Sequence, residues 1–202
     1  AGAPGLTAIA ADFTTKPGIP LVKVDRLTCK KGVSTVTLTQ SEFSVDRKDE
    51  VAAKPTMWKV PLLVSAGGEP VRAILDDGKG TVSVNGCGPV VINAGQLGYY
   101  RSLYTPKMLG ALKTAMPALQ PVDQIGLLQD NLALASSGYQ PYGPAFDLLA
   151  AVPGNGNPVV AASAFGRYLG AWRALEADPA GKKKLAAKVT ANYKPRLVAL
   201  GF

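Results

Sequence analysis

The chain has 202 residues, of which 22 are Lys or Arg and 14 are Asp or Glu, giving a formal net charge of +8. It contains no histidine, so the most common general base and the most common zinc-binding side chain are both missing from the sequence. The two cysteines cannot alone provide the four ligands of a structural zinc site. We therefore predict that this chain has no catalytic, cofactor-binding or metal-binding residues of its own.

The opening segment, residues 1–15, differs in character from the rest of the chain. Residues 6–13 are compatible with one or two helical turns, and Lys16-Pro17-Gly18 ends the segment. No core of its own accompanies this short helix. We interpret residues 1–15 as the tail of a preceding domain.

Residues 16–105 consist of short β-branched runs separated by turn residues. In the run 34–39, apolar side chains recur every second residue, which places Val36 and Leu38 on one face of a strand. Gly32 and Asp77-Gly78 stand where the chain must reverse. The pattern predicts an antiparallel β-sandwich of about seven strands. The expected strands are 21–28, 33–40, 58–65, 71–75, 81–84, 90–93 and 99–104.

Three tyrosines cluster at the end of this region. Strand alternation sends Tyr100 and Tyr104 to one face and Tyr99 to the other. We predict that they pack at the junction between two domains, in preference to stacking on a ligand.

Cys29 and Cys87 both lie beside turn signals. The sequence is compatible with a disulfide between two loops at the edge of a sheet, and equally with two small buried thiols. Both alternatives stay open at this point.

Residues 106–202 carry the signals of helices. Thr105-Pro106, Asn157-Pro158 and Asp178-Pro179 each offer a side-chain N-cap followed by proline at the first helical position. Gly138 stands where a left-handed residue ends a helix. We predict antiparallel helical hairpins. The first expected helix begins at Pro106, and the others span 122–137, 144–151, 159–175 and 181–200.

Other polar groups favour structural interpretations over sites. Asp76-Asp77 precedes Gly78 and indicates a turn, and the run 154–157 lacks the Lys-Ser/Thr ending of a phosphate-binding loop. Ser136, Ser137 and Ser163 have no histidine to activate them. The uncharged stretches 80–100 and 148–166 are interrupted by Asn, Gly and Pro, so no membrane span is predicted.

Basic residues gather near the C-terminus. From Arg167 to Arg196 there are eight basic and two acidic residues, a net charge of +6. Such a patch is able to attract nucleic acid or an acidic membrane surface. The lysines share a helix with Leu185 and Val189, however, and no series of aromatic residues alternates with them for base stacking. We interpret them as a solvated helix face and predict no nucleic-acid partner.

Several short motifs occur in an order that points to a known family. They are Pro17-Gly18-Ile19-Pro20-Leu21-Val22, Leu38-Thr39-Gln40-Ser41-Glu42-Phe43, Trp58-Lys59-Val60-Pro61 and Asn93-Ala94-Gly95-Gln96-Leu97-Gly98-Tyr99-Tyr100-Arg101-Ser102-Leu103-Tyr104. This succession resembles the region after the catalytic domain in the aminopeptidase N family of gluzincin metallopeptidases, where it reads roughly PGxPxV, LTQxxF, WxxPL and NxGxxGYYRxxY. Residues 127–138 are similar to the family's first long helical segment. The resemblance covers residues 13–138 best.

The resemblance implies a β-sandwich followed by the beginning of a helical C-terminal domain. In such enzymes an upstream catalytic domain holds zinc through HExxH and a later glutamate, and removes N-terminal residues from peptides. HExxH is absent here, so no catalytic or zinc-binding residue carries over. The implied partners are the upstream catalytic domain, the rest of the helical domain and, for the parent enzyme, a peptide substrate. Paired cysteines in this region imply a periplasmic or exported protein.

We therefore expect a non-catalytic scaffold fragment with boundaries at 1–15, 16–105 and 106–202. The alternative is an autonomous β-sandwich module that binds sugars or proteins through its loops. A Trp-rich face would favour that alternative. Trp58 and Trp172 are the only tryptophans, and both are expected in cores.

Overall fold

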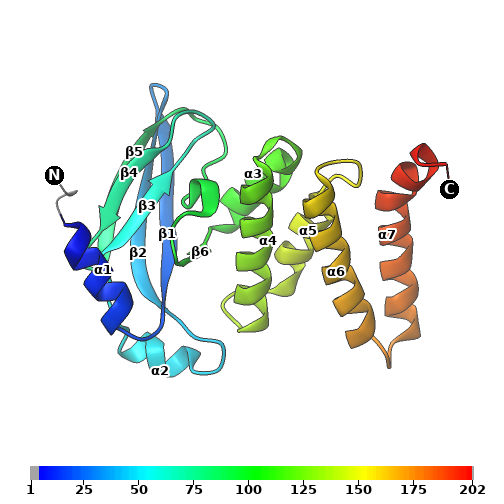
Figure 1. Ribbon diagram of the computed structural model, residues 1–202, viewed down its shortest axis with the longest axis horizontal. Helices are drawn as coiled ribbons and strands as arrows, with labels where there is room; N and C mark the ends of the chain where they lie inside the picture. Colours follow the sequence, from blue (N-terminus) through cyan, green and yellow to red (C-terminus); the bar gives the residue numbers. More distant parts are fainter. Residues whose placement is uncertain (1–4, 202) are drawn as a thin grey trace.

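The computed structural model describes residues 5–201, with the strands at one end of an elongated molecule and helices α3 to α7 in a row toward the other (Figure 1). Of the predicted tail 1–15, residues 1–4 lie outside the described residues. The strands are β1 (Ile19–Lys30), β2 (Val33–Phe43), β3 (Val60–Val64), β4 (Val71–Leu75), β5 (Lys79–Asn85) and β6 (Arg101–Leu103). The helices are α1 (Leu6–Thr15), α2 (Lys48–Ala53), α3 (Pro106–Ala115), α4 (Pro121–Ser136), α5 (Tyr142–Ala151), α6 (Pro158–Ala174) and α7 (Pro179–Ala199). Two short 3-10 turns are η1 (Ala94–Gln96) and η2 (Met116–Ala118). The predicted order, strands and then helices, is confirmed.

The strands form two sheets. One has four strands in the order β5-β2-β1-β6, and the other pairs β3 with β4. All pairs are antiparallel except β1 with β6, which run parallel from Leu21↔Arg101 to Lys23↔Leu103. The all-antiparallel expectation is therefore wrong at β6. After β5 at one edge of this sheet, the chain crosses to the other edge before it forms β6, and it arrives there running in the same direction as β1.

Residues 90–93 were expected to form a strand, and this expectation is also wrong. The segment makes two isolated bridges, Ser65↔Val91 and Leu63↔Asn93. The first is antiparallel and the second parallel, so no regular ladder can continue along β3. Its backbone turns instead into η1, which carries the chain toward the helices.

The larger of two hydrophobic clusters in residues 5–201 extends from the sheets into the helices. It begins with Val22 in β1, includes the fully buried Trp58, and continues to Tyr168 in α6. The Gln40 amide, itself buried, accepts from the Trp58 N–H at 2.7 Å and donates to the Trp58 carbonyl at 2.8 Å. Because sheets and helices share this core, neither half buries its apolar surface without the other.

All three predicted N-caps are confirmed. The Thr105 side chain accepts from Met108 N–H in α3, that of Asn157 from Val159 N–H in α6, and that of Asp178 from Gly181 N–H in α7. Gly138 has a φ of 74°, which satisfies the left-handed position expected after α4. The six-residue helix α2 was not predicted. It is too short to show a periodic apolar pattern.

The last helix is attached by its polar groups as much as by apolar contacts. No residue of α7 is fully buried, although Leu185 and Val189 pack against the core. Asn192 and Arg196 donate to the carbonyls of Val152 and Gly154 at 3.0 and 2.9 Å. The expectation for Trp172 is wrong: it is partly exposed in α6, with the Lys182 ammonium 5.4 Å from its ring centroid.

Candidate functional site: the junction between sheets and helices

The longest of the sequence motifs lies in one connecting segment, residues 92–104. This segment leaves the sheet side of the molecule, forms η1, returns as β6 beside β1, and then enters α3. Gly95 and Arg101 of this segment donate to carboxylates of α4, and β6 pairs with β1 of the sheet. It is therefore the covalent and the packed connection between the two halves.

Asn93 holds the first turn of this segment closed. Its amide donates to the Gly98 carbonyl at 2.9 Å, and its side-chain oxygen accepts the Gly98 N–H at 2.9 Å. Between them, Gly95 has a φ of 72° and donates its N–H to the Asp123 carboxylate of α4 at 2.7 Å. Burial raises the pKa of the Asp123 carboxyl, and the Gly95 N–H acts against this rise.

Tyr100 and Tyr104 enclose the backbone of Ile92. The Tyr100 hydroxyl donates to the Ile92 carbonyl, and the Tyr104 hydroxyl accepts the Ile92 N–H at 3.1 Å. Both side chains are buried, whereas Tyr99 is 64% exposed and contacts Phe13 of α1 edge to face. Burial raises the pKa of both the Tyr100 and the Tyr104 hydroxyl. These two tyrosines thus bond to the main chain inside the core.

Arg101 and Asp130 join β6 to α4. The Arg101 guanidinium donates to one Asp130 carboxylate oxygen at 2.9 Å, and the Ser102 N–H donates to the other at 2.9 Å. Burial raises the pKa of the Asp130 carboxyl, while Arg101 and Ser102 lower it. The guanidinium also lies over the Phe43 ring of β2, 5.7 Å from its centroid. One ion pair therefore connects three elements.

Two glycines allow these elements to approach closely. A Cβ added to Gly98 would overlap the Tyr100 ring, and one added to Gly126 of α4 would overlap the Gln96 side chain. The Gln96 amide in turn donates to the Asn93 carbonyl at 2.9 Å. Both glycines serve close packing rather than backbone flexibility.

The chemistry available at the junction is structural. Its carboxylates are occupied by Arg101 and by backbone N–H groups. Within residues 5–201, no group of three or more Cys, Asp or Glu side chains is arranged to hold a metal ion. Asp77 and Gly78 both have positive φ, which confirms the predicted turn, and Asp76 pairs with Lys59 of the adjacent segment.

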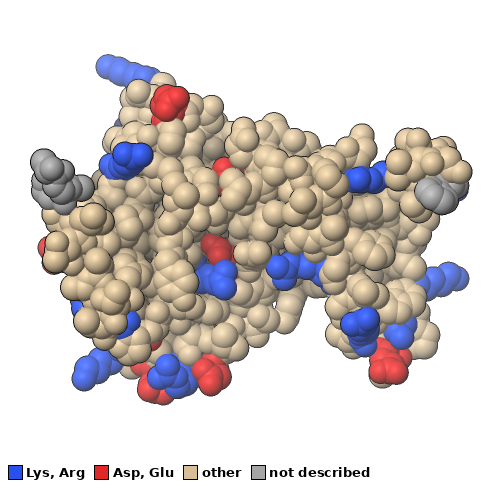
Figure 2. Space-filling model, in the orientation of Figure 1, with Lys and Arg blue, Asp and Glu red and all other residues tan. Residues whose placement is uncertain are grey.

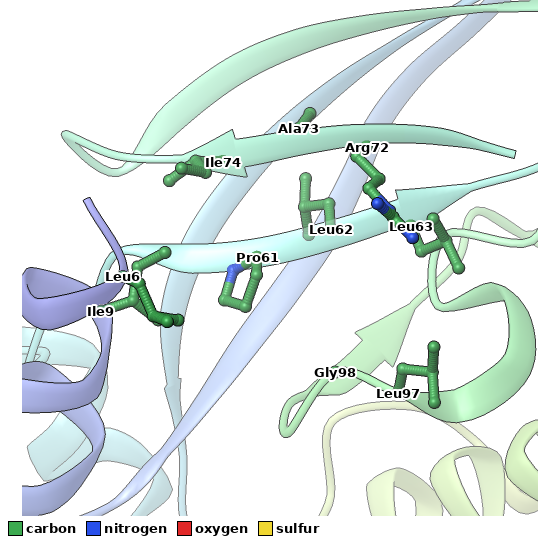
Figure 3. A pocket seen from close by; sticks show the side chains of 10 residues that line it. All are labelled: Leu6, Ile9, Pro61, Leu62, Leu63, Arg72, Ala73, Ile74, Leu97 and Gly98. Carbon is green, nitrogen blue, oxygen red and sulfur yellow. The ribbon is translucent and has the colours of Figure 1, made fainter. Parts of the chain in front are cut away.

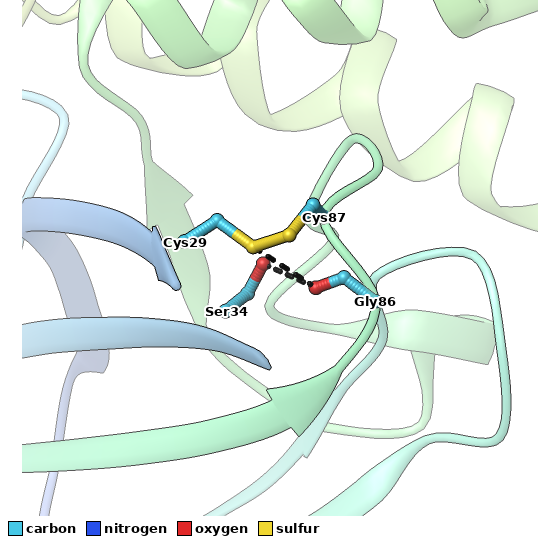
Figure 4. The surroundings of a disulfide bond; sticks show 4 residues. All are labelled: Cys29, Ser34, Gly86 and Cys87. Atoms are coloured by element: carbon cyan, nitrogen blue, oxygen red, sulfur yellow. Dashed lines mark hydrogen bonds between the residues drawn. A yellow bond between two sulfur atoms is a disulfide. The ribbon is translucent and has the colours of Figure 1, made fainter. Parts of the chain in front are cut away.

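The structure joins Cys29 and Cys87 in a disulfide with a Cα–Cα distance of 5.6 Å (Figure 4). It ties the end of β1 to the loop that follows β5. Beside it, the Ser34 hydroxyl donates to the Gly86 carbonyl at 2.6 Å. The link closes the end of the sheet that lies away from α2 (Figure 1).

The helices leave an open groove of about 1110 Å³ between α4 and α6. Polar residues along it include Arg101, Gln129, Ser136, Ser163 and Arg167. Figure 2 shows charged side chains at both ends of the drawn face and along its lower edge, with a few near its middle. None of the helices in residues 5–201 combines the length and the apolar character needed to span a bilayer.

Comparison with known proteins identifies the class to which this architecture belongs. The family model described as ERAP1-like C-terminal domain matches residues 89–202, which include the junction and all helices from α3 onward. The chain belongs to this family, and its membership confirms the resemblance to the aminopeptidase N family.

Individual relatives agree with this assignment. The chain is 28% identical over 140 residues to a puromycin-sensitive aminopeptidase of Caenorhabditis elegans, a match that covers 64% of this chain. It is 26% identical over 134 residues to the probable M1 family aminopeptidases 1 and 2 of Encephalitozoon cuniculi, covering 66% of this chain. Each match spans 14% of the relative's own length.

Sequence reasoning singled out the three tyrosines and missed the ion pair beside them. The structure places Tyr100 and Tyr104 in the shared core between strands and helices, and Tyr99 on the surface next to α1. Arg101 and Asp130 are 29 residues apart, so no local pattern links them. The available signal was one charged residue within each of two otherwise uncharged runs, 92–104 and 124–137.

Proposed function

We propose that this chain is the non-catalytic scaffold of a zinc-dependent aminopeptidase, lying between its catalytic domain and the rest of its helical domain. In this proposal residues 1–15 end the catalytic domain, 16–105 form the sheet domain, and 106–202 begin the helical domain. The parent enzyme removes N-terminal residues from peptides, with zinc held upstream of this chain.

The observation that carries the proposal is the junction itself. Family membership supports the enzyme class. The match to the Caenorhabditis elegans relative spans only 14% of that protein, which leaves room for a separate catalytic domain. The Arg101–Asp130 pair and the shared core favour a fixed angle between sheets and helices. A fixed angle is what a scaffold needs if the helices are to bound one side of a substrate chamber.

The chain's own chemistry is consistent with that role. A sequence without histidine has no source of the HExxH ligands, so peptide hydrolysis would require residues outside these 202. The groove between α4 and α6 gives the helical part a concave surface with arginine, serine and glutamine side chains. In the proposed parent this surface faces the substrate chamber.

The test compares this chain with the product of the complete reading frame that contains it. Both proteins are purified with zinc in the buffer and assayed on aminoacyl-anilides. We expect hydrolysis by the longer protein that a chelator abolishes, and none by residues 1–202. Hydrolysis by the 202-residue chain, or a complete reading frame that encodes no HExxH, would contradict the proposal.

A further inference from the structure

An apolar groove of about 660 Å³ crosses the outer face of the β3–β4 ribbon (Figure 3). The outward side chains of the ribbon form its floor, α1 forms one wall, and the turn after η1 forms the other. The lining residues that matter here are Leu6, Ile9, Pro61, Arg72, Ile74 and Leu97.

Strand β3 is apolar on both faces. Val60, Leu62 and Val64 point into the core and are buried, whereas the intervening Pro61 and Leu63 point outward. The register places Ile74 beside Pro61 on this outer face, and Ile74 is 52% exposed. An antiparallel sheet with one solvated face alternates apolar with polar residues, and a continuous apolar run is typical of a strand covered on both sides. The sequence of β3 therefore fits a strand whose outer face is covered.

Leu97 projects from the opposite wall. At 81% exposure it is the most exposed large hydrophobic side chain within residues 5–201. It is not on a loose loop, because the Asn93–Gly98 hydrogen bonds and the Gly95–Asp123 bond fix the turn on either side of it. Because the backbone on either side of Leu97 is already fixed, burying this side chain against a partner requires little further ordering of the backbone.

The other wall, α1, is itself only half covered. Its carboxylate Asp12 accepts the Lys59 N–H at 2.7 Å and pairs with Lys16, which anchors the end of the helix next to β3. None of its residues is fully buried, and Leu6 at its first turn is 58% exposed at the groove. The chain thus enters the described structure along this wall.

We propose that this groove docks the polypeptide that precedes α1 in the parent protein, through apolar side chains and one carboxylate that pairs with Arg72. This inference rests on the proposed function, which puts a catalytic domain upstream. The matched relatives are about seven times longer than the matched segment, so a preceding segment has ample length to fold back. Attachment through α1 holds that segment close to the groove and raises its effective concentration there.

The experiment measures how fast a maleimide reagent modifies Leu97→Cys. Glu69→Cys, at the exposed tip of the same β3–β4 hairpin, is the matched control. Both substitutions are made in residues 1–202 and in the complete protein. We expect Leu97→Cys to react at least about tenfold more slowly in the complete protein, with the control unchanged between the two.

Three results would overturn the proposal. One is an equal rate at Leu97→Cys in both proteins. Another is a reaction at Leu97→Cys that slows in residues 1–202 alone as the protein concentration is raised, because a second copy of the chain would then occupy the groove. The third is a complete reading frame that adds no domain before Ala1.

A second variant keeps the test independent of cysteine chemistry. The side chain of residue 97 is exposed in this chain, so Leu97→Asp should leave the melting temperature of residues 1–202 unchanged. In the complete protein, where the docked segment would cover this side chain, we expect the melting temperature to decrease by about 2–4 °C. An unchanged melting temperature in both would contradict docking. The aminoacyl-anilide assay on the same complete protein distinguishes docking from the proposed function. If the complete protein is active but its Leu97→Cys thiol reacts rapidly, docking alone is refuted. If the complete protein is inactive but its Leu97→Cys thiol is protected, the proposed function alone is refuted.

Discussion

The guanidinium of Arg101 donates to Asp130 at 2.9 Å across the boundary between the sheet and α4, and the same carboxylate accepts the Ser102 N–H. Only 8% of the Asp130 side chain is exposed, against 30% for Arg101. A charge buried to this degree needs its partner, because loss of one member leaves the other desolvated without compensation.

Arg101→Met should therefore lower the free energy of unfolding by about 2–4 kcal/mol, toward the lower limit because Arg101 keeps some solvent contact. The measurement is urea unfolding followed by the fluorescence of the two tryptophans, Trp58 and Trp172. Arg173→Met, in the last turn of α6 and outside the described ion pairs, is the control and should change stability little. Equal small effects of the two substitutions would refute the role given to the ion pair.

The same variant should change the pH dependence of stability. Burial raises the pKa of Asp130, and removal of Arg101 raises it further. A carboxyl whose pKa is higher in the folded than in the unfolded state binds its proton more readily when folded. Stability should then increase as the pH falls from neutral through that raised pKa, and Arg101→Met should recover part of its loss near pH 5. A loss that stays constant from pH 7 to pH 5 would contradict this.

Because Tyr100 and Tyr104 are buried, we expect the free energy of unfolding to decrease at alkaline pH. Their hydroxyls titrate near pH 10 in the unfolded chain, and burial raises both pKa values in the folded protein. The unfolded state therefore loses protons first, and each tyrosine should lower stability by about 1.4 kcal/mol per pH unit above pH 10. Unfolding measured from pH 9 to 11 should be less steep for Tyr100→Phe and Tyr104→Phe. Curves as steep for both variants as for the unchanged protein would contradict the assignment.

Two glycine substitutions should act in opposite directions. Gly98→Ala forces a methyl group into the Tyr100 ring and should destabilise the protein by about 1–3 kcal/mol. Gly110→Ala meets nothing within 4 Å in the middle of α3, and should stabilise it by about 0.5–1 kcal/mol through helix propensity. Melting temperatures of the two variants check this. A neutral Gly98→Ala would mean that the junction is not closely packed.

The Cys29–Cys87 link is expected to be present in the folded protein at full occupancy. Thiol titration under denaturing, non-reducing conditions should find no free thiol, and the Cys29→Ser/Cys87→Ser double variant should be less stable by roughly 4 kcal/mol in the chain-entropy description. Two titratable thiols in material purified from an oxidising compartment would remove this link from the account.

The helical part was the more predictable because its signals are local. Thr105, Asn157 and Asp178 bond to backbone groups within three residues, so each cap can be recognised from a short stretch of sequence. Tyr100 and Tyr104 flank the short strand β6 and are both buried, as the alternation predicted.

The features that sequence reasoning missed depend on distant partners. The parallel pairing of β6 with β1 depends on where the connection after β5 places the three residues of β6. The Arg101–Asp130 pair joins β6 to α4, two elements that are separate in the sequence. The irregular segment 90–93 makes two bridges of opposite sense, one to Leu63 of β3 and one to Ser65 just after it. The local sequence predicts none of these features, because tertiary contacts override strand propensity in such short segments.

The central claim is that this chain supplies framework and no reaction centre, and metal analysis tests it most directly. Residues 1–202 and the complete protein are each equilibrated with zinc, dialysed, and analysed for bound metal together with aminoacyl-anilide hydrolysis. We predict that zinc and activity are found together in the complete protein and that the 202-residue chain retains neither. Stoichiometric zinc and hydrolysis in the 202-residue chain would contradict the account.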